Sequence, residues 1–187
     1  MVRSLVPFDV TICGIPELDK FRDAKVSHVL SIIDPHEPEP EAFRYYPSHE
    51  RLTLRFDDIV AAYPGFQAPG RDDVKKLLDF GQSLDSAGRD GHLLVHCHAG
   101  ISRSTAATAI LLAQHNPGRE QEAFLALLEL RNHAWPNTRM VEFADDLMAR
   151  NGALLVGLDA YRRALLERKP HLAEIIRNIG RGNELPS

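Results

Sequence analysis

The stretch that decides the fold is His-Leu-Leu-Val-His-Cys-His-Ala-Gly-Ile-Ser-Arg-Ser at residues 92–104, followed by the apolar run 106–113. Residues 93–95 are apolar and follow an Asp-Gly turn signal, as in a buried strand of a parallel sheet. Residues 106–113 are apolar on nearly every face, as expected of a central helix covered on several sides. The sequence therefore predicts a strand, a short loop and a buried helix in direct succession.

The loop between this strand and this helix has the spacing of an anion site, because Cys97 and Arg103 enclose five residues. Such a loop can direct successive backbone N–H groups at one anion, with the positive end of the helix behind them. Gly100 lets the backbone approach the anion, and the planar guanidinium of Arg103 can bind two phosphate oxygens at once. The same positive field favours the thiolate of Cys97, which is predicted to be a nucleophile at neutral pH.

Neighbouring features make this Cys-x5-Arg pattern specific: His96 precedes the cysteine, Ser104 follows the arginine, and apolar segments lie on both sides. The pattern resembles the signature of the cysteine-dependent protein tyrosine phosphatases, and it is most similar to their dual-specificity-like branch and its small bacterial relatives. The resemblance implies that His96 sets the loop conformation and that Ser104 stabilises the departing thiolate. It also implies a phosphate site formed by His98, Ala99, Gly100, Ile101, Ser102 and Arg103.

A phosphatase of this kind also needs a general acid to expel the alkoxide or phenoxide at neutral pH. Two aspartates, Asp57 and Asp58, follow the alternating apolar residues of a predicted strand at 52–56. The resemblance places an aspartate just past such a strand, in register with Leu54, Phe56 and Asp58. Asp58 is therefore the predicted general acid and Asp57 its alternative, although adjacent aspartates in a loop also serve as turn or cap residues.

Alternative interpretations of the loop assign it to a metal site or to proteins of other functional classes. His92, His96 and His98 with Cys97 suggest a metal site, but consecutive strand residues point to opposite faces, so the four side chains cannot easily converge. No metal or organic cofactor is expected, because the loop itself supplies the positive field. A phosphoprotein-binding module with poor turnover and a rhodanese-like sulfurtransferase remain alternatives; the two aspartates speak against the first, and His96 with the five-residue spacing against the second.

The composition sets the remaining expectations. The chain has 187 residues, of which 44% are hydrophobic and 26% charged, which is ordinary for one soluble globular domain. A net charge of −4 without a basic run argues against nucleic acid or an anionic membrane as partner. No signal peptide or membrane-spanning run of about 20 apolar residues is recognisable. The two cysteines fit a reducing compartment, so a cytoplasmic location is expected.

The expected substrate is phosphorylated protein, with phosphotyrosine favoured. The loop has no lysine between Cys97 and Arg103, and residues 34–41 are acidic, so inositol polyphosphates and phosphoinositides are less expected.

The whole pattern predicts a single α/β domain with a central, mostly parallel sheet of about four to five strands flanked by helices. Residues 1–150 are expected to form a dual-specificity-like core, and residues 151–187 a helical extension packed on the same domain. Asn137 is interpreted as a helix N-cap, and a supporting role beside the phosphate loop is the weaker hypothesis. Strands are expected at 8–13, 26–33, 43–46, 52–56 and 93–95, and helices at 17–22, 71–86, 106–113, 122–131, 138–149 and 153–168, with a last short helix ending at Gly180.

Overall fold

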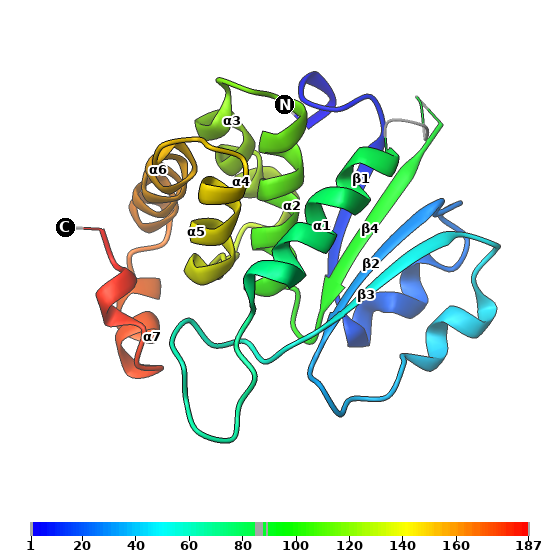
Figure 1. Ribbon diagram of the computed structural model, residues 1–187, viewed down its shortest axis with the longest axis horizontal. Helices are drawn as coiled ribbons and strands as arrows, with labels where there is room; N and C mark the ends of the chain where they lie inside the picture. The colour runs from blue at the N-terminus through cyan, green and yellow to red at the C-terminus, as the bar shows by residue number, and fades with distance from the viewer. Residues whose placement is uncertain (1, 85–87, 89, 187) are drawn as a thin grey trace.

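The sheet is parallel throughout. A computed structural model describes residues 2–84, 88 and 90–186, and within these residues four strands pair in the order β1-β4-β2-β3. Because every neighbouring pair is parallel, all strands end at one edge of the sheet (Figure 1). The predicted α/β fold with a central parallel sheet is confirmed. The strands are β1 (Asp9–Gly14), β2 (His28–Ile33), β3 (Glu50–Arg55) and β4 (His92–Cys97).

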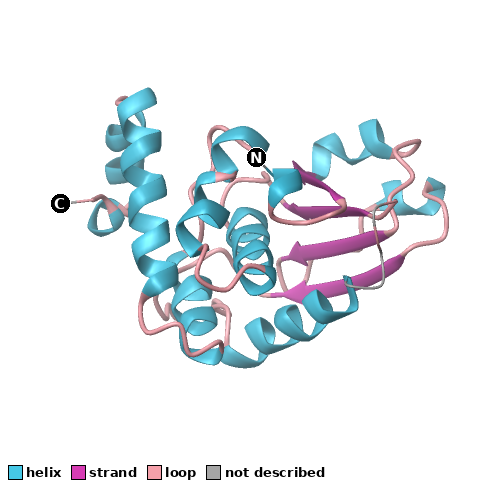
Figure 2. Ribbon diagram, turned by 90° about the horizontal axis from the view of Figure 1, so that it is seen from above, coloured by secondary structure: helices cyan, strands magenta, loops and turns pink. Residues whose placement is uncertain are grey.

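Helices cover both faces of this sheet (Figure 2). One face carries the short 3-10 helices η2 and η3, and the other carries the α-helices, with α2 lying across β4 and β1. The elements other than strands are η1 (Val2–Ser4), η2 (Ile15–Phe21), η3 (Glu41–Tyr45), α1 (Arg71–Ser83), α2 (Arg103–His115), α3 (Glu120–Leu125), α4 (Leu127–Leu130), α5 (Thr138–Leu147), α6 (Ala153–Arg168), α7 (Leu172–Asn178) and η5 (Gly182–Glu184).

The alternation of β4 divides its side chains between two hydrophobic cores. Val95 and Cys97 point into the larger core, which includes the buried apolar residues of α2. Leu94 points into the smaller core beneath η2 and η3. His96 points the same way as Leu94, and its ring lies 5.3 Å from that of Phe43. The strand therefore separates Cys97 from the histidine that precedes it.

Several predicted elements differ from the structure, and the helix predicted at 17–22 is the 3-10 helix η2. Residues 43–46, predicted as a strand, lie in and directly after the 3-10 helix η3, because Pro40 precedes this turn and Phe43 and Tyr46, three residues apart, both reach the smaller core. The helix expected at 122–131 is two short helices, α3 and α4. The helix expected at 71–86 ends at Ser83, and its last two expected residues lie outside the described part of the chain.

The C-terminal helices return to the carboxyl edge of the sheet. Helix α6 packs against α3 and α5, and the buried Tyr161 hydroxyl on it donates to the carbonyl of Ala134 (2.9 Å). Helix α7 and η5 then lie beside the loop that follows β4, where Arg181 contacts Ser102. None of the helices in the described residues has the length and apolar character needed to cross a membrane.

Candidate active site

Cys97 and Arg103 lie at the two ends of one buried loop, hereafter the 97–103 loop. Cys97 is the last residue of β4 and Arg103 the first of α2, and they are only 2% and 3% exposed. The Cys97 Sγ lies 3.2 Å from the Ser104 Oγ. The hydroxyl is thus placed to donate a hydrogen bond to the sulfur when it is a thiolate.

The backbone carbonyls of residues 98–102 are all bound by donors outside the loop. In a planar trans peptide the N–H points opposite to the C=O. Carbonyls held outward therefore direct the N–H groups toward the inside of the loop, as an anion site requires. The pairs are Ile15 N to His98 O (3.0 Å), Arg131 Nη2 to Ala99 O (3.1 Å), Arg131 Nε to Gly100 O (3.1 Å), Trp135 N to Ile101 O (2.8 Å) and Asn137 N to Ser102 O (3.3 Å).

Arg131 and Glu17 form a clamp on this loop that the sequence analysis missed. Arg131 donates to both oxygens of Glu17 (3.0 and 2.6 Å) as well as to the two loop carbonyls. Glu17 also accepts from the backbone N–H of Gly14 (2.8 Å). The hydrogen bond from Arg131 lowers the pKa of Glu17 to about 2, so the clamp stays charged at neutral pH. No local sequence signal joins two residues so far apart in the chain.

Gly100 is required by the shape of the loop. Its φ is +68°, in the left-handed region that favours glycine. A Cβ at this position would also lie 2.6 Å from the carbonyl carbon of Cys13. The loop therefore packs directly on the end of β1, which supports its close turn.

The guanidinium of Arg103 is held from one end. Its Nη1 donates to Asp34 Oδ1 (2.6 Å) and to the carbonyl oxygen of Phe56 (2.6 Å). Its Nε is buried and has no hydrogen-bond partner among the described residues. Since a buried unpaired donor is costly, this nitrogen is suited to an anion in the cavity. Asp34 belongs to the acidic segment 34–41, and its ion pair with Arg103 was not predicted.

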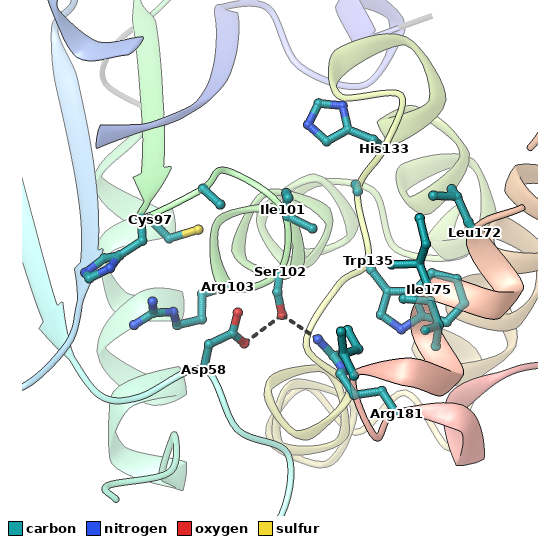
Figure 3. A pocket seen from close by; sticks show the side chains of 15 residues that line it. Asp58, Cys97, Ile101, Ser102, Arg103, His133, Trp135, Leu172, Ile175 and Arg181 are labelled. Carbon is teal, nitrogen blue, oxygen red and sulfur yellow. Dashed lines mark hydrogen bonds between the residues drawn. The ribbon is translucent and has the colours of Figure 1, made fainter. Parts of the chain in front are cut away.

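The structure separates the two candidate acids. Asp58 lines the same cavity as Cys97, and its Oδ1 accepts from Ser102 Oγ (2.7 Å) (Figure 3). The same oxygen also accepts from Asn137 Nδ2 (2.9 Å). The carboxylate of Asp57 instead accepts from the backbone N–H of Gln67 (2.7 Å). The backbone N–H of Asp57 in turn donates to the carbonyl oxygen of Gln67 (2.7 Å). Asp57 therefore closes a loop, and Asp58 faces the site.

Asn137 caps a helix and also contacts the candidate acid. Its Oδ1 accepts from the backbone N–H of Met140 (3.2 Å), which caps α5. Its Nδ2 donates to Asp58 (2.9 Å). The side chain thus ties the start of α5 to the candidate acid.

The three histidines of the motif lie in different surroundings. His96 is fully buried, its Nε2 lies 2.7 Å from Ser31 Oγ, and burial lowers its pKa to about 3, so the ring is neutral. The His92 ring bonds to Thr11 Oγ1 (2.8 Å) and to the carbonyl of Ala24 (2.9 Å). His98 lines the cavity with Cys97. His92 and His96 share one face of β4 but lie four residues apart along the strand, and each ring binds different groups.

The cavity over the loop has a volume of about 400 Å³, which is within the range of small-molecule sites. Cys97, Arg103 and Asp58 line it on one side. Its other side is formed by Trp135 and by residues of the C-terminal segment that the sequence analysis did not place near the site.

Solved structures share this architecture. Human DUSP28 has a TM-score of 0.58 at 19% identity, covering 78% of this chain and 97% of that chain. DUSP15 has a TM-score of 0.54 at 22% identity, covering 88% and 94%. The human tyrosine phosphatase-like serine/threonine/tyrosine-interacting protein has a TM-score of 0.57 at 19% identity, covering 79% and 95%. The fold is that of the dual-specificity phosphatases.

Sequence relatives agree with this dual-specificity phosphatase fold. MAP kinase phosphatase with leucine-rich repeats protein 1 of Dictyostelium discoideum is 29% identical over 132 residues, and protein 2 of the same organism is 28% identical over 132 residues. The matches cover 67% of this chain but only 14% and 16% of those relatives. No protein-family model matches the sequence. The resemblance to the cysteine-dependent protein tyrosine phosphatase superfamily, predicted from the loop, is confirmed by these likenesses.

Proposed function

We propose that the chain is a phosphomonoester hydrolase, a protein tyrosine or dual-specificity phosphatase that acts through a cysteinyl-phosphate. The observation that carries this proposal is one cavity lined together by the Cys97 thiol, the Arg103 guanidinium and the Asp58 carboxyl group. A nucleophile, a fixed positive charge and a proton donor are the three groups that this displacement at phosphorus needs.

In the first step the Cys97 thiolate attacks phosphorus in line with the leaving oxygen. The S–P bond forms, the P–O bond breaks, and Asp58 gives its proton to the leaving oxygen. The loop N–H groups and Arg103 bind the equatorial oxygens, where negative charge must be stabilised.

In the second step a water molecule replaces the leaving group. Asp58, now a carboxylate, takes a proton from this water as its oxygen attacks phosphorus, and the S–P bond breaks to return the thiolate and inorganic phosphate. The Ser104 hydroxyl, 3.2 Å from the sulfur, is positioned to stabilise the departing thiolate. His96 acts from behind the strand on the loop conformation and does not touch substrate. This route uses no metal or organic cofactor.

Phosphorylated protein is the substrate class we propose, with phosphotyrosine favoured. Two relatives are named MAP kinase phosphatases. Phosphoinositides are the rival class, since PTPMT1, which shares the fold with a TM-score of 0.53 at 20% identity, was solved in complex with PI(5)P. The Asp34 carboxylate beside Arg103 and the apolar outer part of the cavity disfavour an inositol ring with several phosphates.

We also propose that residues 151–187 belong to the same domain as residues 1–150, because α6 packs on α3 and α5. A reducing compartment such as the cytoplasm suits the proposed nucleophile, which must remain a free thiol; both cysteines are free in the structure.

The test is hydrolysis of an aryl phosphate between pH 5 and 8 in reducing, metal-free buffer. We expect activity to disappear in Cys97→Ser. Asp58→Asn should lose roughly 100-fold or more in kcat, and the basic limb of its pH profile should be absent. Asp57→Asn, the matched control, should keep the native kcat and the basic limb of the pH profile. An inactive native chain that still binds phosphotyrosine peptides would favour the binding module, and transfer of sulfur from thiosulfate would favour the sulfurtransferase.

A further inference from the structure

The cavity has an outer side built by the C-terminal segment. Its apolar members are Leu172, Ile175, Ile176 and Ile179, hereafter the C-terminal wall. Ile175 is 49% exposed and Ile179 59% exposed, and Ile101 of the 97–103 loop, which lines the same cavity, is 37% exposed. Large apolar side chains thus gather at the mouth of the candidate active site (Figure 3), as is typical of surfaces that bind an apolar ligand.

This wall is fixed in place by a buried carboxylate. Glu184, 8% exposed, accepts from Trp135 Nε1 (2.6 Å), from Thr138 Oγ1 (2.7 Å) and from Arg181 (2.8 Å), and Arg162 also contacts it (3.3 Å). Burial raises the pKa of Glu184, but Arg181 and Arg162 outweigh this effect and hold the pKa below its usual value. The carboxylate therefore stays ionised and anchors the segment after α7.

The same segment reaches the candidate acid. Arg181 Nη1 donates to Ser102 Oγ (3.2 Å), and Ser102 Oγ donates to Asp58 Oδ1 (2.7 Å) (Figure 3). The other nitrogens of this guanidinium, Nε and Nη2, donate to Glu184 (2.8 and 3.1 Å). Arg181 thus joins the C-terminal wall to the residue that would protonate the leaving group.

The geometry of in-line displacement places the leaving group of the substrate against the C-terminal wall. The attacking sulfur and the leaving oxygen lie on opposite sides of phosphorus, so the leaving group must extend away from Cys97 and past Asp58 into the outer cavity. We propose that the C-terminal wall is a subsite for the leaving group, and that it selects phosphomonoesters whose alcohol carries an extended apolar, aromatic group. This inference rests on the proposed hydrolase activity and adds the substrate chemistry.

The test compares 2-naphthyl phosphate with phenyl phosphate, which differ by one apolar ring. We expect kcat/KM for the naphthyl ester to exceed that for the phenyl ester by about tenfold. In the double variant Ile175→Asn/Ile179→Asn this ratio should fall toward one. Val156→Asn is the matched control, because Val156 is 64% exposed on α6 beside Gly152 and Leu125, outside the cavity, and it should keep the native ratio.

Two further measurements keep the outcome decisive. Trp135 is the single tryptophan of the chain and binds Glu184, so unchanged emission shows that the segment remains docked in the double variant. If the native chain hydrolyses neither ester, calorimetric titration of Cys97→Ser with both esters tests the subsite alone: an affinity about tenfold higher for the naphthyl ester, lost in the double variant, supports it. Equal handling of both esters, or a ratio that the double variant keeps, would overturn the subsite.

Discussion

The 97–103 loop and the C-terminal wall form two sides of one cavity but are held by different forces. The loop is placed by polar contacts, with each carbonyl of residues 98–102 bound by its own donor nitrogen. The wall is apolar, with Ile175 and Ile179 about half exposed, and one buried carboxylate, that of Glu184, anchors its end. Hydrogen bonds fix both the distance and the angle between two groups, whereas apolar contact is non-directional. This difference explains why we assign phosphoester cleavage to the loop and selection of the leaving group to the wall.

The largest effect should follow from breaking the loop and sparing the wall. Gly100→Ala places a Cβ 2.6 Å from a backbone carbon at a φ of +68°, so the loop must shift. We expect kcat/KM for phenyl phosphate to fall at least roughly 100-fold, because a displacement of about 1 Å in a site costs that much. The preference for naphthyl over phenyl ester should survive in the residual activity.

Gly118→Ala is the control for backbone strain. Its φ is +83°, but nothing lies within 4 Å of the added Cβ, so it should lose stability without losing activity per folded molecule. Equal activity of the two variants would mean that the close packing of the loop on β1 is not needed for catalysis.

An intermediate effect is expected from loosening the loop without filling space. Arg131→Met removes the donors to two loop carbonyls and the partner of Glu17. We expect kcat to fall roughly tenfold to 100-fold, with a smaller change in KM, in steady-state kinetics on phenyl phosphate. Arg22→Met, which removes an exposed ion pair with Asp19, is the matched control. A change in KM alone would place Arg131 in substrate binding rather than in support of the loop.

The smallest effect concerns the pH dependence of stability. The pKa of His96 is about 3 in the folded chain and 6.5 ordinarily, so the unfolded chain binds the proton more tightly. The stability conferred by the neutral ring is complete above pH 6.5 and declines as the pH falls toward 3. Between pH 6.5 and 5 the free energy of unfolding should drop by roughly 2 kcal/mol.

Urea unfolding at several pH values measures this decline, which His96→Gln should reduce. His36→Gln, at an exposed histidine, should not change the dependence of the unfolding free energy on pH. The wall, whose apolar side chains do not titrate, should keep its preference for the naphthyl ester over the same pH interval. An identical pH dependence of the unfolding free energy in His96→Gln and in the native chain would contradict the assignment of this dependence to His96.

Much of the site could be predicted because it is encoded within a few neighbouring residues. The loop spacing, the glycine and the flanking apolar segments place Cys97 and Arg103 at a strand-to-helix junction, which the structure contains. The strand predicted at residues 43–46 was wrong, because aromatic residues three apart serve a 3-10 turn as well as a strand. The resemblance favoured Asp58 over Asp57 as the general acid, but only the fold shows that the Gln67 backbone binds Asp57.

The sequence by itself determined the parallel α/β fold and the Cys-x5-Arg loop, because periodicity and turn chemistry act between residues close along the chain. Only the tertiary structure decided which groups surround that loop: Asp34 on Arg103, Arg131 on the loop carbonyls, and Ile175, Ile179 and Arg181 at the outer cavity. These contacts join segments tens of residues apart. Their pairing depends on how the helices pack on the sheet, which no local pattern records.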